Sequence, residues 1–485
     1  MVEGPPFSTR SFRFQPAENR SPLGVPMPTT EDAGSEEMYR PLLQPQGEAV
    51  GSGSSSGFSH KVCVGGEGDD ASATSDGTSV AAATFNLVTT VIGSGMMALP
   101  YVFKTLGLVG AAAGSALVCL VSWASACMLI SASQSQHNTF GKLMKGSLGT
   151  SWTLTSDICV TLNNMGLLVV FLDIISDCLV GAGNKQGMHL PGLLSSLSGT
   201  VPDIALSRPV VMGIMMVFVI APAALRRSFN SMKWTSMYSV CFAGFFVCMT
   251  AGLGVYHWSA GKVAPIHLFP EKGTSFLTIL SNIPVIMSAF ICHYNINPLM
   301  AELAEPQKNN MYKVVGITLP VCCALNMIVG ASAVLIFGDN TQSDILQNLS
   351  QMDIPNAGLL VDIVRIGYII SLACTFPVIL FTLRESLLSL IPWKIDKTSS
   401  SVFYTTSIVI LVLEYVFMIC VPNIIDVIEL MASTVTMMIG FILPSLVTIK
   451  LAEGSLGVIL LSSAMFWGGI IIGILGFAIS LTHVL

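Results

Sequence analysis

Eleven mostly apolar segments, each at least 20 residues long, dominate this sequence. A helix of about 20 residues spans the roughly 30 Å hydrocarbon core of a bilayer. Lipid satisfies no backbone polar groups, so segments of this kind must form helices. The sequence therefore predicts an all-α integral membrane protein with eleven transmembrane helices at residues 79–102, 106–132, 152–180, 206–225, 234–256, 276–300, 313–337, 359–390, 401–421, 424–449 and 455–482.

Composition excludes the main soluble classes. Of the 485 residues, 52% are hydrophobic and only 10% are charged, against about 25% in an average soluble domain. The net charge of −6 and the lack of a basic cluster exclude a nucleic-acid binder. The sequence has no nucleophile–base motif, no phosphate loop and no Cys-x-x-Cys pair. We therefore expect neither an enzyme nor a metal or cofactor site.

The first 78 residues differ from the rest. They contain eleven acidic and five basic side chains and hold the whole net charge of −6. Because this stretch is rich in Gly, Ser and Pro, it predicts a disordered acidic cytoplasmic tail, followed by a membrane domain over residues 79–482. Within the tail, Tyr39-Arg40-Pro41-Leu42 has the Tyr-x-x-apolar form that sorting adaptors read. A chance match in a disordered tail is the alternative.

The distribution of Lys and Arg predicts the orientation. With a cytoplasmic N-terminus, sixteen of the 22 basic residues lie in the tail and inner loops, as the positive-inside rule requires. An odd number of spans then leaves the C-terminus outside or in a lumen. The sequon Asn348-Leu349-Ser350 falls on an outer loop, which predicts N-glycosylation at Asn348.

Two of the predicted spans carry helix-weakening residues. Span one contains Gly93-Ser94-Gly95 at mid-membrane, and span six contains Pro284 followed by the polar stretch Phe290–Pro298. Interrupted helices at matching positions are typical of transporters built from inverted repeats. Pairing span one with span six predicts a five-plus-five repeat, with span eleven as an addition.

The breaks have a chemical consequence. Unwound backbone N–H groups at a half-helix N-terminus suit a carboxylate, and unwound carbonyls suit an ammonium group or a cation. A site with both is complementary to a zwitterionic amino acid. This predicts substrate contacts from Gly93, Ser94 and Gly95 on one side and from Cys292, Tyr294 and Asn295 on the other. The alternative is that the small residues only permit close helix packing.

Five motifs then support a resemblance. In order and position, they resemble the amino acid/auxin permease family, and within it the sodium-coupled neutral amino acid transporters and the plant vacuolar-type transporters. The likeness covers roughly residues 79–482. The motifs are Asn86–Pro100, Ile291–Asn295, Ile336–Gly338 with Asp344–Leu346, Thr375–Arg384 and Gly440–Pro444.

The resemblance implies a LeuT-like fold with spans one and six broken. In the sodium-coupled members, an Asn early in span one and a Thr in span eight help to form a cation site, and Asn86 and Thr375 match those positions. The same side chains also suit capping of freed backbone groups, and the plant relatives are usually considered proton-driven. The coupling ion, H⁺ or Na⁺, stays open.

Other polar residues lie within the spans. Asp173 and Asp177, four residues apart on span three, and His293 beside the break are candidates for proton coupling. The favoured interpretation places both acids in water at the outer end of the span. The pair Asn163-Asn164 predicts either substrate contact or hydrogen bonds between helices. Glu414 lies in an apolar run and must have a partner or face water.

The function that follows is a secondary active transporter of neutral or small amino acids, working by alternating access with H⁺ or Na⁺. An alternative is a transporter-like receptor that senses amino acids and signals through its tail. The expected partners are an amino acid substrate and the lipid bilayer. The expected membrane is either vacuole- or lysosome-like or the plasma membrane.

Overall fold

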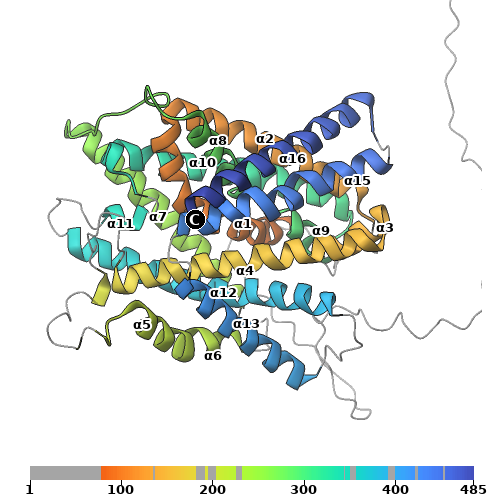
Figure 1. Ribbon diagram of the computed structural model, residues 1–485, viewed down its shortest axis with the longest axis horizontal. Coiled ribbons are helices and arrows are strands. Elements are labelled where there is room, and N and C mark those ends of the chain that lie inside the picture. Colours follow the sequence, from red (N-terminus) through yellow and green to blue (C-terminus); the bar gives the residue numbers. More distant parts are fainter. Residues whose placement is uncertain are drawn as a thin grey trace, which may run out of the picture. The chain divides into compact units, whose positions relative to one another are not determined.

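The computed structural model (Figure 1) describes most of the predicted membrane domain. The predicted tail and its Tyr39–Leu42 motif lie outside the described residues, apart from Thr78. The described residues are 78–134, 137–181, 192–194, 202, 204–225, 232–342, 345–349, 357–391, 399–420, 424–451 and 454–484.

Helices make up nearly all of this part of the chain. Their order follows the apolar segments of the sequence, with short helices added in the connections. In chain order they are α1 (Val80–Leu106), α2 (Leu108–Ala132), α3 (Phe140–Leu148), α4 (Thr150–Val180), α5 (Arg208–Met215), η3 (Met216–Ile220), α6 (Ala221–Ala224), α7 (Met232–Ser259), α8 (Phe276–Ser288), α9 (His293–Glu302), α10 (Gln307–Phe337), η5 (Gly338–Asn340), α11 (Ile345–Leu349), α12 (Ala357–Leu390), α13 (Ser400–Cys420), α14 (Ile424–Met431), η6 (Ala432–Thr436), η7 (Met438–Ile442), α15 (Leu443–Leu451) and α16 (Leu456–Val484).

The all-α membrane class is confirmed, but the number of spans is not. Among the described residues, nine helices are long and apolar enough to cross a bilayer, and the bent helix α1 makes a tenth. The segment predicted at 206–225 forms a shorter apolar helix, Arg208–Ala224. At 1.5 Å per residue this helix is about 26 Å long, slightly less than the hydrocarbon core is thick.

Both spans depart from a straight helix at the predicted positions, but the unwinding predicted at Gly93–Gly95 is absent, because α1 continues as a helix from Val80 to Leu106. The two halves of α1, Val80–Ile92 and Gly95–Leu106, meet at an angle of 51°. In span six, helix α8 ends at Ser288 and helix α9 begins at His293, with non-helical backbone between them. The breaks in spans one and six are therefore of different kinds. The first bends the helix axis, and the second interrupts the helix.

The two breaks lie against each other. A Cβ atom built on Gly95 would come within 2.7 Å of the Ala289 Cβ and 2.9 Å of its Cα. Only glycine permits this approach, because any side chain at position 95 would overlap the backbone of span six. Close packing is thus one role of the Gly-Ser-Gly sequence.

Helix α4 lies alongside α12 and α13, as Figure 1 shows. Two side-chain hydrogen bonds set its register against α12. The Thr161 hydroxyl bonds to Ser386 Oγ at 3.0 Å, and the Ser389 hydroxyl donates to Asp157 Oδ2 at 2.8 Å. As α4 advances by four residues, α12 recedes by three, so the two helices run antiparallel. Their buried contact forms much of the scaffold behind the breaks.

Candidate functional site

A cavity lies between the two breaks and the helices that face them. Its volume is about 30 Å³, room for about two water molecules and too little for an amino acid. The lining comes from four parts of the chain: α1, α4, the span-six break with α9, and span ten. The residues are Thr90, Val91, Asn163, Leu167, Val170, Ser288, Ile291, Tyr294, Ile428, Met431 and Thr436.

The lining contains no charged side chain. Its polar groups are hydroxyls and one amide, set among aliphatic side chains. Across the cavity, the Thr436 hydroxyl donates to Asn163 Oδ1 at 3.4 Å, which joins span ten to α4. In the described part of the chain, no three His, Cys, Asp or Glu side chains are grouped so that they could hold a metal ion. The cavity therefore offers hydrogen bonds without a fixed charge.

The residues predicted in span six separate into different roles. Tyr294 lines the cavity. The Asn295 amide donates to Thr90 Oγ1 at 3.3 Å and so connects the start of α9 to the first half of α1. Cys292 is fully buried and does not line the cavity.

The predicted carboxylate site in span one is backbone. Gly93 and Ser94 lie at the 51° bend, and Gly95 begins the second half of α1. The side chain of Ser94 lies outside the described residues. Thr90, one turn before the bend, reaches the cavity, and its hydroxyl donates to the Asn86 carbonyl at 3.1 Å.

His293 is fully buried but does not line the cavity. Its ring lies beside Phe441 of η7, with 6.2 Å between the ring centroids. A Cβ at Gly440 would stand 3.9 Å from His293 Nδ1, so the imidazole also packs against the backbone of span ten. The structure favours a packing role for this histidine.

The two predicted cation-site residues have separate surroundings. Asn86 is exposed in α1. Thr375 Oγ1 donates to the Ser371 carbonyl at 2.9 Å and lies 3.0 Å from Ser239 Oγ of α7. The hydroxyl's two partners, Ser371 and Ser239, lie on α12 and α7. A cation shared by Asn86 and Thr375 would require the Thr375 hydroxyl to turn away from these partners.

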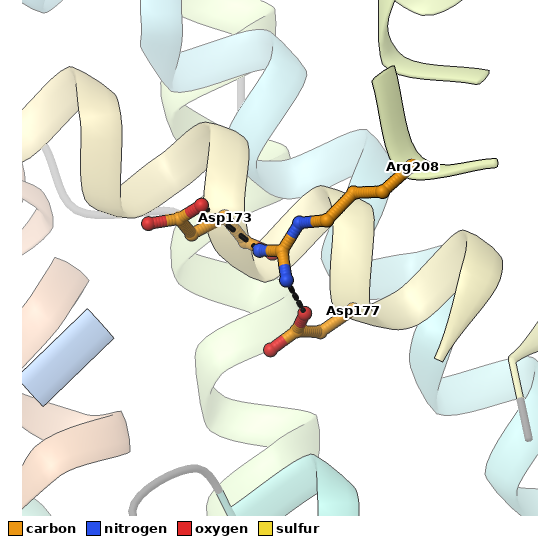
Figure 2. A network of polar contacts seen from close by, with 3 residues as sticks. All are labelled: Asp173, Asp177 and Arg208. Atoms are coloured by element: carbon orange, nitrogen blue, oxygen red, sulfur yellow. Dashed lines mark hydrogen bonds and ion pairs between the residues drawn. The ribbon is translucent and has the colours of Figure 1, made fainter. Parts of the chain in front are cut away.

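The two acids of span three form a cluster with an arginine (Figure 2). Arg208, the first residue of α5, reaches between them, with Nη2 2.9 Å from Asp173 Oδ1 and Nη1 3.1 Å from Asp177 Oδ1. Asp173 is fully buried, and Asp177 is 8% exposed. The favoured expectation that both acids lie in water is therefore wrong, because the start of α5 covers this end of α4.

Asn348 does not fit the predicted glycosylation site. Its side chain is fully buried. The amide Nδ2 donates to the Asn340 carbonyl at 2.8 Å, and Oδ1 accepts from the Gln342 backbone N–H at 2.7 Å. A glycan attached at Nδ2 would displace these bonds, so Asn348 instead fixes the connection after α10.

On the side predicted to be cytoplasmic, the end of α2 and the following loop meet α9. The Asn297 amide donates to Ser133 Oγ at 2.9 Å and to the His137 carbonyl at 3.1 Å. Burial, with the positive charges of Lys142 and Lys308, lowers the pKa of the His137 imidazole. The histidine is thus held neutral beside two lysines.

Of the polar residues that line the cavity, the sequence indicated Tyr294 and Asn163, but it did not indicate Thr90, Ser288 or Thr436. Thr436 ends the π-helical segment η6, and a second π-helical segment, η7, follows in the same span. π-Helical turns often occur at functional sites. No sequence pattern predicts such a turn. The sequence pointed to the neighbouring hydroxyls Ser433 and Thr434 of span ten, and only the structure places Thr436 at the cavity.

Comparison with known proteins gives a consistent family. The sequence profile described as "Transmembrane amino acid transporter protein" matches residues 76–485. The chain is 32% identical to "Amino acid transporter AVT6E" of Arabidopsis thaliana over 399 residues, which cover 81% of this chain and 80% of that protein. It is 25% identical to human "Solute carrier family 38 member 8" over 315 residues, covering 62% and 67%.

Two solved structures are also similar. MhsT in complex with L-phenylalanine has a TM-score of 0.49 and 13% identity, covering 84% of this chain and all of that one. A Na⁺-coupled sialic acid symporter has a TM-score of 0.46 and 10% identity, covering 84% and 89%.

Proposed function

The chain belongs to the transmembrane amino acid transporter family, and on that premise we propose that it is a secondary active transporter of neutral amino acids, working by alternating access. The proposed substrate class, neutral amino acids, rests on the cavity at the two breaks. This cavity is lined by hydroxyls, one amide and aliphatic groups, without a charged side chain. A substrate with a charged side chain would lose its hydration there without gaining a counter-charge.

The breaks supply the groups that a zwitterion needs. In this proposal, α1 opens at its bend, and the backbone N–H groups at Gly93, Ser94 and Gly95 then receive the substrate carboxylate. The freed carbonyls of span six, with Tyr294 nearby, receive the ammonium group. The side chain of the substrate then points towards Asn163 and Thr436, whose hydrogen bond offers both a donor and an acceptor.

The small volume of the cavity supports alternating access. At about 30 Å³, the site must enlarge before an amino acid enters. Helices α1 and α9 are the elements that their breaks free to move, whereas α4 is held by its contacts with α12 and α13. Movement of the broken helices against α4 would open the cavity.

The coupling ion has two candidate routes. Asn86 and Thr375 would hold Na⁺, which prefers oxygen ligands. Asp173, Asp177 and His293 would instead bind H⁺, and the two carboxylates around the single Arg208 guanidinium are the stronger set, because only one of their charges is balanced within the cluster. A vacuole- or lysosome-like membrane, reached through Tyr39–Leu42, or the plasma membrane is the proposed location.

A matched pair of neighbours tests the site. Asn163 lines the cavity, whereas Asn164 is fully buried and does not. We expect Asn163→Leu to abolish exchange of labelled neutral amino acids in proteoliposomes, because leucine removes the amide and fills the cavity. Asn164→Leu should retain exchange. Equal loss in both variants, or full exchange by Asn163→Leu, would contradict the site.

The ion is identified in the same vesicles. A Na⁺ gradient and a pH gradient are imposed separately, and accumulation of the labelled amino acid is measured. Accumulation driven by Na⁺ supports Asn86 and Thr375, and accumulation driven by pH supports the acid cluster. Exchange without accumulation under either gradient would show facilitated transport and overturn the coupled mechanism.

A further inference from the structure

Glu414, in the middle of α13, is a fully buried carboxyl group. Neither of its oxygens has a hydrogen-bond partner among the described residues. The expectation that it faces water is therefore wrong, and the expected partner is not among the hydrogen bonds of the described residues. An ionised carboxylate placed in such surroundings would have a very high free energy, so it is the neutral acid that fits them. A neutral carboxyl group carries an O–H donor that still needs an acceptor.

The register between α12 and α13 points to that acceptor. The Arg384 side chain of α12 donates to Ser407 Oγ of α13 at 3.1 Å. The two helices follow each other through a short connection and run antiparallel. Seven residues make two helical turns and return to the same face of a helix. Moving seven residues along each helix therefore places Glu414 within about one turn of Pro377.

Pro377 leaves an acceptor free at that level. It lies inside α12 and has no backbone N–H, so the carbonyl of Ala373, four residues earlier, loses its helical donor. Within a membrane span, such a carbonyl must be satisfied by a neighbouring helix or by water. The protonated carboxyl of Glu414 has the complementary donor.

From this arrangement we propose that Glu414 is a proton-binding site, whose protonated carboxyl donates to the backbone carbonyl that Pro377 frees in α12. Loss of the proton replaces the donor with a charge and leaves the carbonyl without a partner. Proton binding at Glu414 thereby changes the stability of α12 at its proline. Thr375, the proposed cation ligand, lies two residues before that proline, so the same segment of α12 would respond to both.

Other charged groups lie on the elements packed against α13. On α4 these are Asp157, which accepts from the Ser389 hydroxyl, and Asp173 and Asp177, both paired with Arg208 of α5. On α12, Arg384 is bonded to Ser407 and stacked over the Phe403 ring with 4.0 Å to its centroid. On α13 itself, the Tyr415 hydroxyl donates to the Pro209 carbonyl.

Infrared difference spectroscopy of the purified protein tests the proton directly. The carbonyl stretch of a protonated carboxylic acid is separate from that of a carboxylate, and it shifts in D₂O. We expect this band in the wild-type protein at neutral pH and its loss in Glu414→Gln. Glu271→Gln, the same change at an exposed loop position, should leave the band unchanged. A band of equal size in Glu414→Gln would overturn the assignment.

Two substitutions of Glu414 test whether its side chain donates a hydrogen bond or is only buried. Gln keeps an N–H donor for the Ala373 carbonyl, whereas Leu does not. We therefore expect Glu414→Leu to melt at a lower temperature than Glu414→Gln. If Glu414 had no acceptor, Leu would instead be the more stable replacement, because it buries no polar group. A higher melting temperature for Glu414→Leu would overturn the proposal.

The functional consequence rests on the proposed transport activity. Amino acid exchange at equal pH on both sides of the vesicle needs no gradient. We expect the exchange rate of the wild type to depend on pH and that of Glu414→Gln to be flatter, since Gln imitates the protonated form. An unchanged pH profile would remove Glu414 from the transport cycle. Failure of all exchange would contradict the transporter proposal alone, because the infrared and melting tests do not depend on it.

Discussion

Two stretches of the same side of α4 differ in charge. Asn163, Leu167 and Val170 line the cavity and carry no charge. One to two turns further along, Asp173 and Asp177 continue this side of the helix and hold Arg208. One side of α4 therefore carries an uncharged stretch that faces the cavity and, after it, a charged stretch that is paired with α5.

The largest effect is expected at Gly95, where α1 packs against the break in span six at Ala289. Gly95→Leu should abolish transport, because even the Cβ would lie 2.7 Å from Ala289 Cβ and the breaks could not close together. Gly95→Ala is the milder variant, and Ala289→Gly in the same protein should restore part of its activity. Exchange assays on protein that elutes as a single species measure this. Full exchange by Gly95→Leu would mean that the breaks need not touch.

The charged stretch is tested by removing its cation. Arg208→Gln leaves Asp173 fully buried beside Asp177 without a counter-charge, and loss of one partner of a buried ion pair costs about 3 kcal/mol or more. A clear fall in melting temperature is expected. Adding Asp173→Asn to Arg208→Gln should recover part of the loss. A melting temperature equal to that of the wild type would show that the cluster contributes no stability.

A smaller effect is expected from removing the Thr436 hydroxyl, which lies in the cavity. Thr436→Val keeps the shape of the side chain and removes the hydrogen bond to Asn163 Oδ1. The same hydroxyl is proposed to bond to the substrate side chain, and a hydrogen bond contributes about 1 kcal/mol, so apparent affinity for such substrates should fall by about fivefold. The effect should be larger for substrates with an amide or hydroxyl side chain than for alanine. Equal losses for all substrates would place the pair outside side-chain recognition.

The smallest effect is expected at His137, a residue outside both stretches of α4, and it concerns the pH dependence of the melting temperature. Because the pKa of His137 is lowered in the folded protein, the unfolded chain takes up a proton first as the pH falls through the ordinary histidine value of 6.5. Stability contributed by the neutral imidazole is therefore present above that pH and is lost below it. His137→Gln should lower the acid sensitivity of the melting temperature slightly and leave its value at pH 8 unchanged. An unaltered pH profile would contradict the assignment.

The sequence determined which segments are helical and where two of them are interrupted. Length, apolar content and the Gly-Ser-Gly and Pro signals are local, and a membrane forces each apolar segment to satisfy its own backbone. The prediction that Tyr294 lies near the break agrees with its place in the cavity lining, and the motifs identified the family correctly. The predicted number of eleven spans is not confirmed, because the helix Arg208–Ala224 is shorter than the helices that can cross a bilayer.

Only the tertiary structure decided which side chains meet. Arg208 reaches Asp173 across a connection of more than 25 residues, and Thr436 joins Asn163 across a far longer stretch. Asn348 is buried and bonded to Asn340 and Gln342, so it is unsuited to glycosylation, and Glu414 is buried without a hydrogen-bond partner among the described residues that would stabilise its charge. Helical periodicity fixes the face on which a residue lies, but the packing of other helices decides what that face contacts.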